Sequence, residues 1–369
     1  MRIMILDKDF EVIGAVGLFT SLIWTRRYYD VGIYELHIPA DFFSLIQKGK
    51  YLFRNDRTEL GIIREINYAQ SDKGQRTAYC KGYFAESLFN NRIIPLTYAK
   101  TGTPETISRD LVNQYVINPT DAGRKIPHII LGDTHGLGTS VSFQSTGDQL
   151  GDKMYEIEKT QEMSHRLAYD YQANTLSFEC WKGLDRRDTQ SVNSWAVFSD
   201  SFYNVKNVTY DKDDSSYSNF AYVAGAGEGT DRTIVEVDGR ADSSEERREI
   251  YVDARDLQKT YTDDGGNEQT YSDSEYLDLL RQRGLEKLSE YSIVETVNSD
   301  VDAEANLVYR KDFDLGDLCT YQNTQMNIEC TKRITEIQEV YEGSKQTLNI
   351  TFGTDTTTSI TKLIKREVS

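Results

Sequence analysis

The sequence predicts a mixed, β-rich α+β protein with two similar antiparallel β-barrel domains that carry helix-containing inserted domains. Tyrosine is frequent, at 24 of 369 residues, and proline is rare, at 5. Tyrosine suits the half-buried surface of a pleated sheet. Alternating apolar runs dominate both ends of the chain, and the length allows two or three cores of about 100–200 residues each.

Residues 1–98 are expected to form the first β-barrel. In YELHIPADF, Tyr34, Leu36 and Ile38 alternate with other residues before Pro39 ends the strand. In GIIREINYAQSDKGQRTAYCKGY, two strand-like runs flank a turn at residues 71–74. This pattern is typical of a β-hairpin.

Residues 99–188 are expected to form an inserted α+β domain. Thr103 can cap a helix whose first position is Pro104, and three residues share one helical face: Ile107, Leu111 and Tyr115. A second helix is predicted at about 147–161. A hairpin turning at residues 172–174 then pairs Leu167, Tyr169 and Tyr171 with Leu176, Phe178 and Cys180.

The second half is predicted to hold a second β-barrel, residues 189–245 plus 296–369, interrupted by a helical insert at 246–295. The helix of this insert has a possible capping box, Ser272 with Glu275. Its apolar stripe, typical of core packing, comprises Leu277, Leu280, Gly284, Leu288 and Tyr291. The last strands alternate at Met326, Ile328 and Cys330, and at Leu348, Ile350 and Phe352 after a turn at residues 342–344.

An internal repeat relates the two ends of the chain. GKYLF (49–53) precedes IREI (63–66), a turn at Gly74 and Gly82. In the same order, GDLCT (316–320) precedes ITEI (334–337), a turn at Gly343 and Gly353. The repeat predicts that both barrels are built on one plan.

The charge of the chain argues against nucleic-acid recognition. Lys and Arg number 42 and Asp and Glu 59, which gives a net charge of −17. DNA-binding proteins gain affinity by neutralising phosphates with cations, so we expect no sequence-specific nucleic-acid binding. The acidic composition either keeps the protein soluble or lines a passage through which DNA moves without binding.

Targeting signals and membrane spans are not expected. No apolar run approaches the roughly 18 residues of a membrane span. The start, MRIMILDKDF, reaches Asp7 too early for a signal peptide. The protein is therefore expected to fold in a cytoplasm.

Cysteines and histidines offer no recognisable site. Cys80, Cys180, Cys319 and Cys330 are far apart in sequence, so we predict free buried thiols instead of zinc ligands or disulfides. The four histidines are His37, His128, His135 and His165, and none lies in a catalytic motif. His128 and His135 could form a metal pair, but a third ligand is lacking and solvated loop positions are the simpler interpretation.

Three aspartates surround one glycine in KDFDLGDLCTY, residues 311–321. Counted from Asp312, an EF-hand loop would have Gly316 where a ligand is needed, so that register fails. Two carboxylates of a glycosidase face each other across a cleft, which neighbours on one short loop rarely do. We therefore interpret Asp312, Asp314 and Asp317 as turn residues, with a calcium site as the alternative.

The glycines of YVAGAGEGTDRTIVEV do not fit a dinucleotide fingerprint. Gly225, Gly227 and Gly229 are spaced differently, and strand-type sequence follows them. A glycine-rich strand connection is the preferred interpretation. The sequence thus predicts no catalytic, cofactor-binding or metal-binding residues, no cofactor, and a protein that is not an enzyme.

Several segments resemble phage tail hub or baseplate hub proteins, particularly the short tail-associated protein of phages with long non-contractile tails. The segments occur along this chain in the same order as in that family. They are RRYYDVGIYELHIPAD, CKGYFAESLFNNRII, WKGLDRRDTQ, NFAYVAGAGEGTDRTIVEV, ERREIYVDARDL, RGLEKL and DFDLGDLCTY, and they span nearly the whole chain. WKGLDRRDTQ resembles a Gly-x-Asp-Arg-Thr corner, from which it departs because Arg187 and Asp188 separate Arg186 from Thr189.

The resemblance implies a homotrimeric structural protein of the virion tail tip, assembled in the bacterial host cytoplasm. Two barrels in each chain would give a ring of six similar units that meets the sixfold tail tube and gates DNA passage. The implied partners are the distal tail or tube protein, the tape-measure protein and receptor-binding or fibre proteins. Because the polar segment TDTTTSITKLIKREVS follows the second barrel, a wall hydrolase or adhesin is expected on another polypeptide.

Two other functions compete with this interpretation. A cell-surface polysaccharide hydrolase would need opposed carboxylates and aromatic platforms, but the tryptophans, Trp24, Trp181 and Trp195, are scattered. A carbohydrate-binding adhesin would bind host cells without the rest of the tail. Neither alternative has a motif in this sequence.

Overall fold

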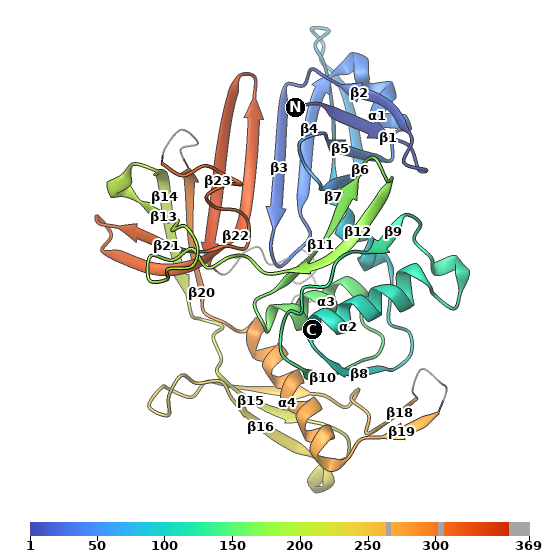
Figure 1. Ribbon diagram of the computed structural model, residues 1–369, viewed down its shortest axis with the longest axis vertical. Helices are drawn as coiled ribbons and strands as arrows, with labels where there is room; N and C mark the ends of the chain where they lie inside the picture. The colour runs from blue at the N-terminus through green and yellow to red at the C-terminus, as the bar shows by residue number, and fades with distance from the viewer. Residues whose placement is uncertain (263–266, 302–305, 354–369) are drawn as a thin grey trace. The chain divides into compact units, whose positions relative to one another are not determined.

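The computed structural model describes residues 1–262, 267–301 and 306–353. The described chain folds into two compact units. Unit 1 comprises Met1–Phe84, Gly183–Asp214 and the residues from Ile293 onward, and unit 2 comprises Ala85–Lys182 and Ser215–Ser292. Each unit is thus assembled from separated stretches of sequence (Figure 1).

Unit 1 is built almost entirely of strands. Its first stretch contains β1 (Ile3–Leu6), β2 (Val12–Val16), β3 (Ser21–Arg27), β4 (Ile33–Pro39), the 3-10 turn η1 (Ala40–Phe42), α1 (Phe43–Lys48), β5 (Tyr51–Arg54), β6 (Leu60–Gln70) and β7 (Arg76–Phe84). The later stretches contain β13 (Val197–Ser199), η5 (Asp200–Phe202), β14 (Val205–Asp213), β20 (Val294–Val301), β21 (Leu318–Asn323), β22 (Ile328–Glu342) and β23 (Lys345–Gly353).

These strands form one sheet of 13 strands, whose main path runs β14-β20-β23-β22-β3-β4-β7-β6-β5-β1-β2, with β21 beside β22 and β13 beside β21. Every pairing is antiparallel except that of β13 with β21. The predicted β-rich, largely antiparallel fold is confirmed. The pairings do not close two separate barrels within the described residues, so two barrel domains are not confirmed.

The core of the first half of unit 1 follows from strand alternation. Tyr34, Leu36 and Ile38 point to one face of β4 and are at most 2 % exposed, as predicted. They pack with Trp24, Leu22, Cys80 and Phe84 in one hydrophobic cluster. The predicted hairpin turns of unit 1 lie where expected: Gly74 and Gly343 adopt positive φ between β6 and β7 and between β22 and β23.

The two halves of unit 1 repeat one order of strands. The first half reads β3-β4-β7-β6-β5-β1 across the sheet, and the second reads β14-β20-β23-β22-β21-β13. In both halves these strands occur in the same order along the chain. The repeat that the sequence predicts therefore extends to the pairing of at least five strands, although β1 pairs antiparallel and β13 parallel.

The repeat holds at the level of single residues. In IREI the pairing of β6 with β7 shifts register between Ile63 and Glu65, and in ITEI that of β22 with β23 shifts between Ile334 and Glu336. The Ile63 amide donates to the Lys50 carbonyl at 2.9 Å, and the Ile334 amide to the Asp317 carbonyl at 2.8 Å. A β-bulge at the same place in both hairpins fixes the correspondence of their positions.

Unit 2 contains most of the helical residues. Its first stretch holds η2 (Ala85–Asn91), β8 (Tyr98–Gly102), α2 (Pro104–Val112), the π-helical turn η3 (Asn113–Ile117), η4 (Ala122–Arg124), β9 (Ile129–Leu131), β10 (Val141–Ser145), α3 (Leu150–Lys159), β11 (Ser164–Asp170) and β12 (Thr175–Trp181). Its second stretch holds β15 (Phe220–Ala224), η6 (Gly229–Asp231), β16 (Ile234–Asp238), β17 (Glu249–Asp253), β18 (Thr260–Thr262), β19 (Glu268–Thr270) and α4 (Asp273–Glu290).

The predicted helices of unit 2 are present with shifted ends. Thr103 caps α2 by accepting the Thr106 amide, and Ser272 and Glu275 form the capping box of α4. The helix expected at 147–161 spans 150–159. The stripe predicted for α4 is incomplete, since Tyr276 and Leu279 are buried while Leu277 and Leu288 only border that core.

Several other predictions are corrected by the structure. Met326 lies in the turn between β21 and β22 and is 39 % exposed, so it does not alternate with Ile328 and Cys330 in one strand. Cys330 is half-buried instead of buried, whereas the other three thiols are buried and all four are free.

Candidate functional site

The three aspartates of DFDLGDLC each bind protein groups in unit 1. Asp312 accepts the Val308 amide at 2.8 Å, and Asp314 pairs with Arg26 at 2.5 Å. Asp317 accepts the Leu184 amide and the Arg186 guanidinium, both at 2.7 Å. These carboxylates thus tie residues 308–317 to two distant segments of unit 1.

Asp317 is the most enclosed of the three, at 4 % exposure. Burial raises the pKa of this carboxyl, although the Leu184 and Asp314 amides and the Arg186 guanidinium act in the opposite direction. The arrangement is that of a carboxylate that anchors loops. The described residues contain no group of three or more His, Cys, Asp or Glu side chains placed to hold a metal ion.

His128, His135 and His165 have different surroundings in the structure. His128 adopts positive φ, and its Nδ1 lies 3.0 Å from the Asn174 carbonyl oxygen. His135 is exposed in a loop, and its backbone amide donates to the buried Glu105 carboxylate. His165 is 3 % exposed, with its Nδ1 2.7 Å from Glu158 Oε2. Ser108 Oγ donates to the same carboxylate at 2.6 Å. Sequence reasoning missed this cluster, whose members are up to 57 residues apart in the chain.

Gly225, Gly227 and Gly229 lie in the connection between β15 and β16, as predicted. Gly227 and Gly229 have positive φ. The preferred interpretation, a glycine-rich strand connection, matches this placement.

Unit 1 instead contains a buried charge network that no motif revealed. Arg54 and Glu339 have fully buried side chains, and Arg54 Nη1 donates to Glu339 Oε2 at 3.1 Å. Arg57 donates to both oxygens of Glu339, through Nε at 3.0 Å and Nη2 at 2.7 Å. The Tyr341 hydroxyl donates to Glu339 Oε2 at 2.6 Å. One carboxylate on β22 thus binds two cations from the first half of the repeat.

Aromatic rings and a second set of charges enclose the network. The Arg54 guanidinium lies 5.4 Å from the ring centre of Trp24 and 5.0 Å from that of Tyr341. Cations over such ring faces are stabilised further when water is excluded. Nearby, Arg26 pairs with Glu59 at 2.6 Å and donates to the Tyr309 hydroxyl at 2.9 Å.

The pKa shifts follow from this environment. Burial alone would raise the pKa of Glu339, but the Arg57 hydrogen bond and the charges of Arg54 and Arg57 outweigh it and hold the pKa below its usual range. Burial and the neighbouring Glu339 charge raise the pKa of Tyr341 to about 12. Glu339 is therefore ionised in the folded protein at neutral pH.

Acidification is expected to remove the stabilisation that Glu339 provides. Because its pKa is lower in the folded than in the unfolded chain, this contribution is complete above the ordinary pKa of 4.5 and is lost as pH falls through the folded value. Urea unfolding at pH 7 and at pH 3 measures this effect. The difference in unfolding free energy between wild type and Glu339→Gln should shrink at pH 3, since protonated Glu339 resembles glutamine. An unchanged difference would contradict the assignment.

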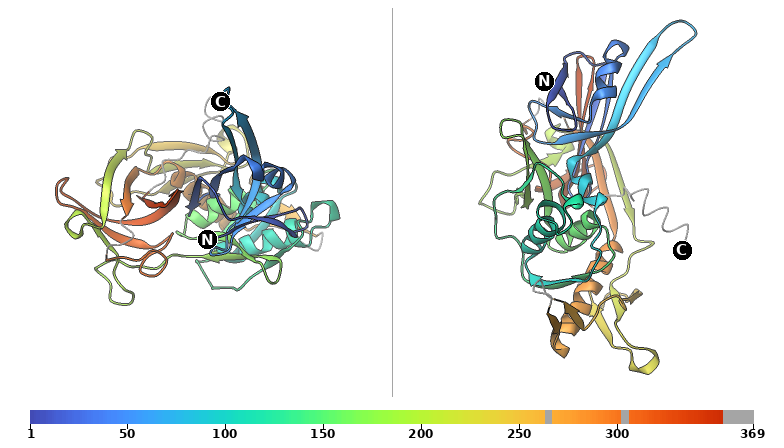
Figure 2. Two further views of the ribbon diagram at one scale, coloured as in Figure 1. Left: turned by 90° about the horizontal axis from the view of Figure 1, so that it is seen from above. Right: turned by 90° about the vertical axis from the view of Figure 1, so that its right-hand side faces the viewer.

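Several strands of unit 1 present open edges, and β6 and β14 are among them. Residues 64–70 of β6 are exposed and pair with β7 on one side only, because β5 covers only residues 60–62. In the right-hand view of Figure 2 this light-blue hairpin extends away from the remainder of the sheet of unit 1. Among the described residues, β14 has β20 as its one strand partner. These edges, together with the charge network, are the candidate interaction site of unit 1.

The edge of β6 carries apolar side chains. Ile66 is 37 % exposed and Tyr68 is 41 % exposed, although the Tyr68 ring also contacts Phe43 at 5.2 Å between ring centres. Open strand edges are templates for pairing with another chain unless they are covered or blocked. The arrangement can therefore bind a strand of another chain.

No helix in the described ranges has both the length and the apolar character that crossing a bilayer requires. Charged side chains recur along the longest helix, α4.

Comparisons with known proteins agree with this fold. The family model described as Siphovirus ReqiPepy6 Gp37-like protein matches residues 2–354. No curated protein matches the chain.

Three solved structures share the fold at low sequence identity. A tail protein from Neisseria meningitidis is 11 % identical, with a TM-score of 0.56 and 96 % of each chain covered. The 43 kDa tail protein of a Shewanella oneidensis prophage is 13 % identical, with a TM-score of 0.57 and coverage of 95 % of this chain and 98 % of that one. The prophage tail protein gp18 of Listeria monocytogenes is 11 % identical, with a TM-score of 0.56 and coverage of 100 % and 99 %.

These findings confirm the resemblance to phage tail proteins that the sequence predicts. The family match spans nearly the whole described chain, and the fold is shared with tail proteins from three bacteria. The chain belongs to the family described as Siphovirus ReqiPepy6 Gp37-like protein.

Proposed function

We propose that this chain is the structural hub at the distal end of a phage tail, where three copies form a ring of six similar β units. Each chain contributes two of these β units, which are the two halves of the repeat in unit 1 and correspond to the two β-barrels expected from the sequence. Residues 99–188 and 246–295 supply most of the inserted parts. The observation that carries the proposal is the repeated strand order of unit 1 together with the open edges of β6 and β14.

The repeat indicates how copies would join. Within the chain, β22 of the second half pairs with β3 of the first, with Glu339 opposite Trp24 and Val340 opposite Ile23. The corresponding strands are β6 and β14, and both have the open edges described above. If β6 of one copy pairs with β14 of the next in the same register, Tyr68 lies opposite Tyr210 and Ala69 opposite Thr209.

This pairing leads to a closed ring. Contacts within chains (β22 with β3) would alternate with contacts between chains (β6 with β14), and three copies would give six similar contacts. A head-to-tail contact must close into a ring or continue as a filament. The trimeric ring would present six similar faces to a sixfold tube.

The further parts of the proposal concern partners and location. The hub would lie at the virion tail tip, join the distal tail or tube protein, and contact the tape-measure protein and the receptor-binding or fibre proteins. It would be assembled in the cytoplasm of the bacterial host. The net charge of −17 would keep the DNA passage free of phosphate binding. This role is structural and requires no catalytic step.

Disulfide cross-linking tests the contact between copies. The variant carries Ala69→Cys and Thr209→Cys, together with Cys330→Ser because that native thiol is the one not fully buried. Under mild oxidation, in concentrated protein and in assembled tails, we expect cross-linked dimers and a limiting trimer on a non-reducing gel. Light scattering should give the mass of a trimer.

Matched variants make this experiment specific. Ala69→Cys with Asp213→Cys moves the second thiol four residues along β14, roughly 13 Å in a strand, and should cross-link poorly. Either single cysteine should give no trimer. A terminal twofold dimer, or equal cross-linking at the shifted position, would contradict the proposed ring.

A further inference from the structure

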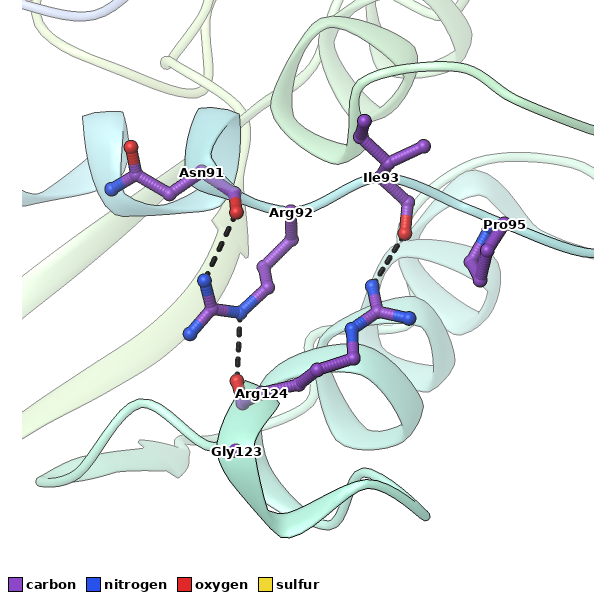
Figure 3. Close-up of a pocket in the computed structure, with 6 residues that line it drawn as sticks. All are labelled: Asn91, Arg92, Ile93, Pro95, Gly123 and Arg124. Atoms are coloured by element: carbon purple, nitrogen blue, oxygen red, sulfur yellow. Dashed lines mark hydrogen bonds between the residues drawn. The ribbon is translucent and has the colours of Figure 1, made fainter.

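A pocket of about 210 Å³ lies in unit 2 between the segment that follows η2 and the turn η4 (Figure 3). Its lining consists of Asn91, Arg92, Ile93, Pro95, Gly123 and Arg124. Both arginines are half-buried, and Ile93 is 50 % exposed. The pocket therefore combines two guanidinium groups with apolar side chains and an opening to solvent.

The two arginines are held by reciprocal hydrogen bonds to main-chain carbonyls. Arg92 Nε donates to the Arg124 carbonyl at 2.7 Å, and its Nη1 donates to the Asn91 carbonyl at 2.9 Å. Arg124 Nη2 donates to the Ile93 carbonyl at 2.5 Å. Arg124 also lies over the Tyr115 ring, 5.2 Å from its centre. Figure 3 shows the two side chains reaching across the pocket in opposite directions. Their positions are thus fixed before any ligand arrives.

Neither guanidinium has a carboxylate partner among the residues that the structure describes, although this chain has 59 acidic residues. Buried arginines elsewhere in the chain, such as Arg54 and Arg283, pair with carboxylates. Burial and the neighbouring Arg124 charge lower the pKa of Arg92. Two adjacent like charges without a counterion favour an external anion.

We propose that Arg92 and Arg124 form a binding site for a doubly charged tetrahedral oxyanion of the phosphate type. After the main-chain contacts, Arg92 Nη2 and Arg124 Nε and Nη1 have no hydrogen-bond partner among the described residues. Guanidinium groups only donate hydrogen bonds, and charge-assisted bonds to phosphate oxygens are among the strongest in proteins. Two fixed cations match the two negative charges of such an anion. This site is independent of the proposed ring.

Calorimetric titration of the full-length protein with sodium sulfate and with inorganic phosphate, at constant ionic strength, tests the site. We expect one site per chain with a dissociation constant on the order of 1 mM. Acetate, which is planar and singly charged, should bind at least about tenfold more weakly because it satisfies only one of the two cations. Equal binding of acetate would overturn the assigned ligand class.

Variants locate the binding. Arg92→Gln and Arg124→Gln should each weaken sulfate binding about tenfold or more, whereas Lys125→Gln, which removes an exposed cation next to the pocket, should change it less than about twofold. If Lys125→Gln weakens binding as strongly as Arg124→Gln, the anion binds a diffuse positive surface and the proposal is wrong.

A second readout guards against loss of folding. Sulfate should raise the Tm of wild type and of Lys125→Gln but not that of Arg124→Gln, because a ligand stabilises only a folded state that binds it. Arg124→Lys keeps the charge and loses the planar group, so it should bind more weakly than wild type while remaining folded. Wild-type affinity in Arg124→Lys would contradict the fixed geometry.

Discussion

Replacing Glu339 by glutamine is expected to lower the free energy of unfolding by about 3–5 kcal/mol, the usual cost of removing one partner from a buried ion pair. Glu339 is fully buried and binds Arg54 and Arg57. Glutamine has nearly the same shape but no charge, and its amide would face two guanidinium groups with an unwanted donor. Among the described residues, Arg54 would then keep one carboxylate partner, Asp56, which is partly exposed.

Urea unfolding followed by circular dichroism measures this change. The matched control is Glu342→Gln, at the exposed end of the same strand, where the expected effect is within about 0.5 kcal/mol. Equal effects of the two substitutions would show that the buried pairs contribute no more than a surface charge.

Methionine at position 339 separates charge from packing. Replacing all members of a buried ion network with apolar groups is often neutral, whereas removing one member leaves the others uncompensated. Glu339→Met combined with Arg54→Met and Arg57→Met should therefore be more stable than Glu339→Met alone. If the triple variant is the less stable one, packing of the arginine stems outweighs the charge effect.

Replacing Gly183 by alanine is expected to destabilise unit 1 by about 1–3 kcal/mol or more, the range for overpacked sites. A Cβ atom at this position would lie 1.9 Å from the Gly316 carbonyl oxygen and 2.5 Å from the Asp317 amide nitrogen. Both neighbours are main-chain atoms, which cannot rotate away as a side chain can. The next residue, Leu184, donates its amide to Asp317 at 2.7 Å, so a shift would also disturb that bond.

Thermal unfolding of Gly183→Ala and Gly17→Ala compares a crowded glycine with an open one. A Cβ at Gly17 meets no atom within 4 Å, and its φ does not require glycine. Gly17→Ala should therefore leave the Tm unchanged or slightly raised, because alanine restricts the unfolded chain. A similar loss in both variants would show that crowding at Gly183 is not the cause.

Local patterns accounted well for individual elements. Alternation predicted β4 and the last strands, and capping residues predicted α2 and α4, because both signals depend on neighbours within a few positions. The prediction at Met326 was wrong and the stripe predicted along α4 was only partly right, because burial there depends on what packs against the element. Alternation does not tell a turn residue from a strand residue, and periodicity alone does not show which helix face meets the core.

The sequence was less informative about the candidate sites. The charge network joins Arg54 and Arg57 to Glu339, more than 280 residues away, and the phosphate-type pocket joins Arg92 to Arg124. No motif marks either one, since contacts of high sequence separation leave no fixed spacing. The aspartates of DFDLGDLC formed a visible cluster in the sequence, yet the structure directs each to a different partner.

The sequence by itself determined the β-rich class, the hairpin turns, the main helix caps and the repeat of GKYLF–IREI in GDLCT–ITEI. These features follow from side-chain alternation and turn chemistry, which act over short distances. Only the tertiary structure decided that both halves of the repeat share one sheet and that β6 and β14 keep open edges. It also decided which charges are buried together, because strand order, edges and burial depend on how distant segments pair.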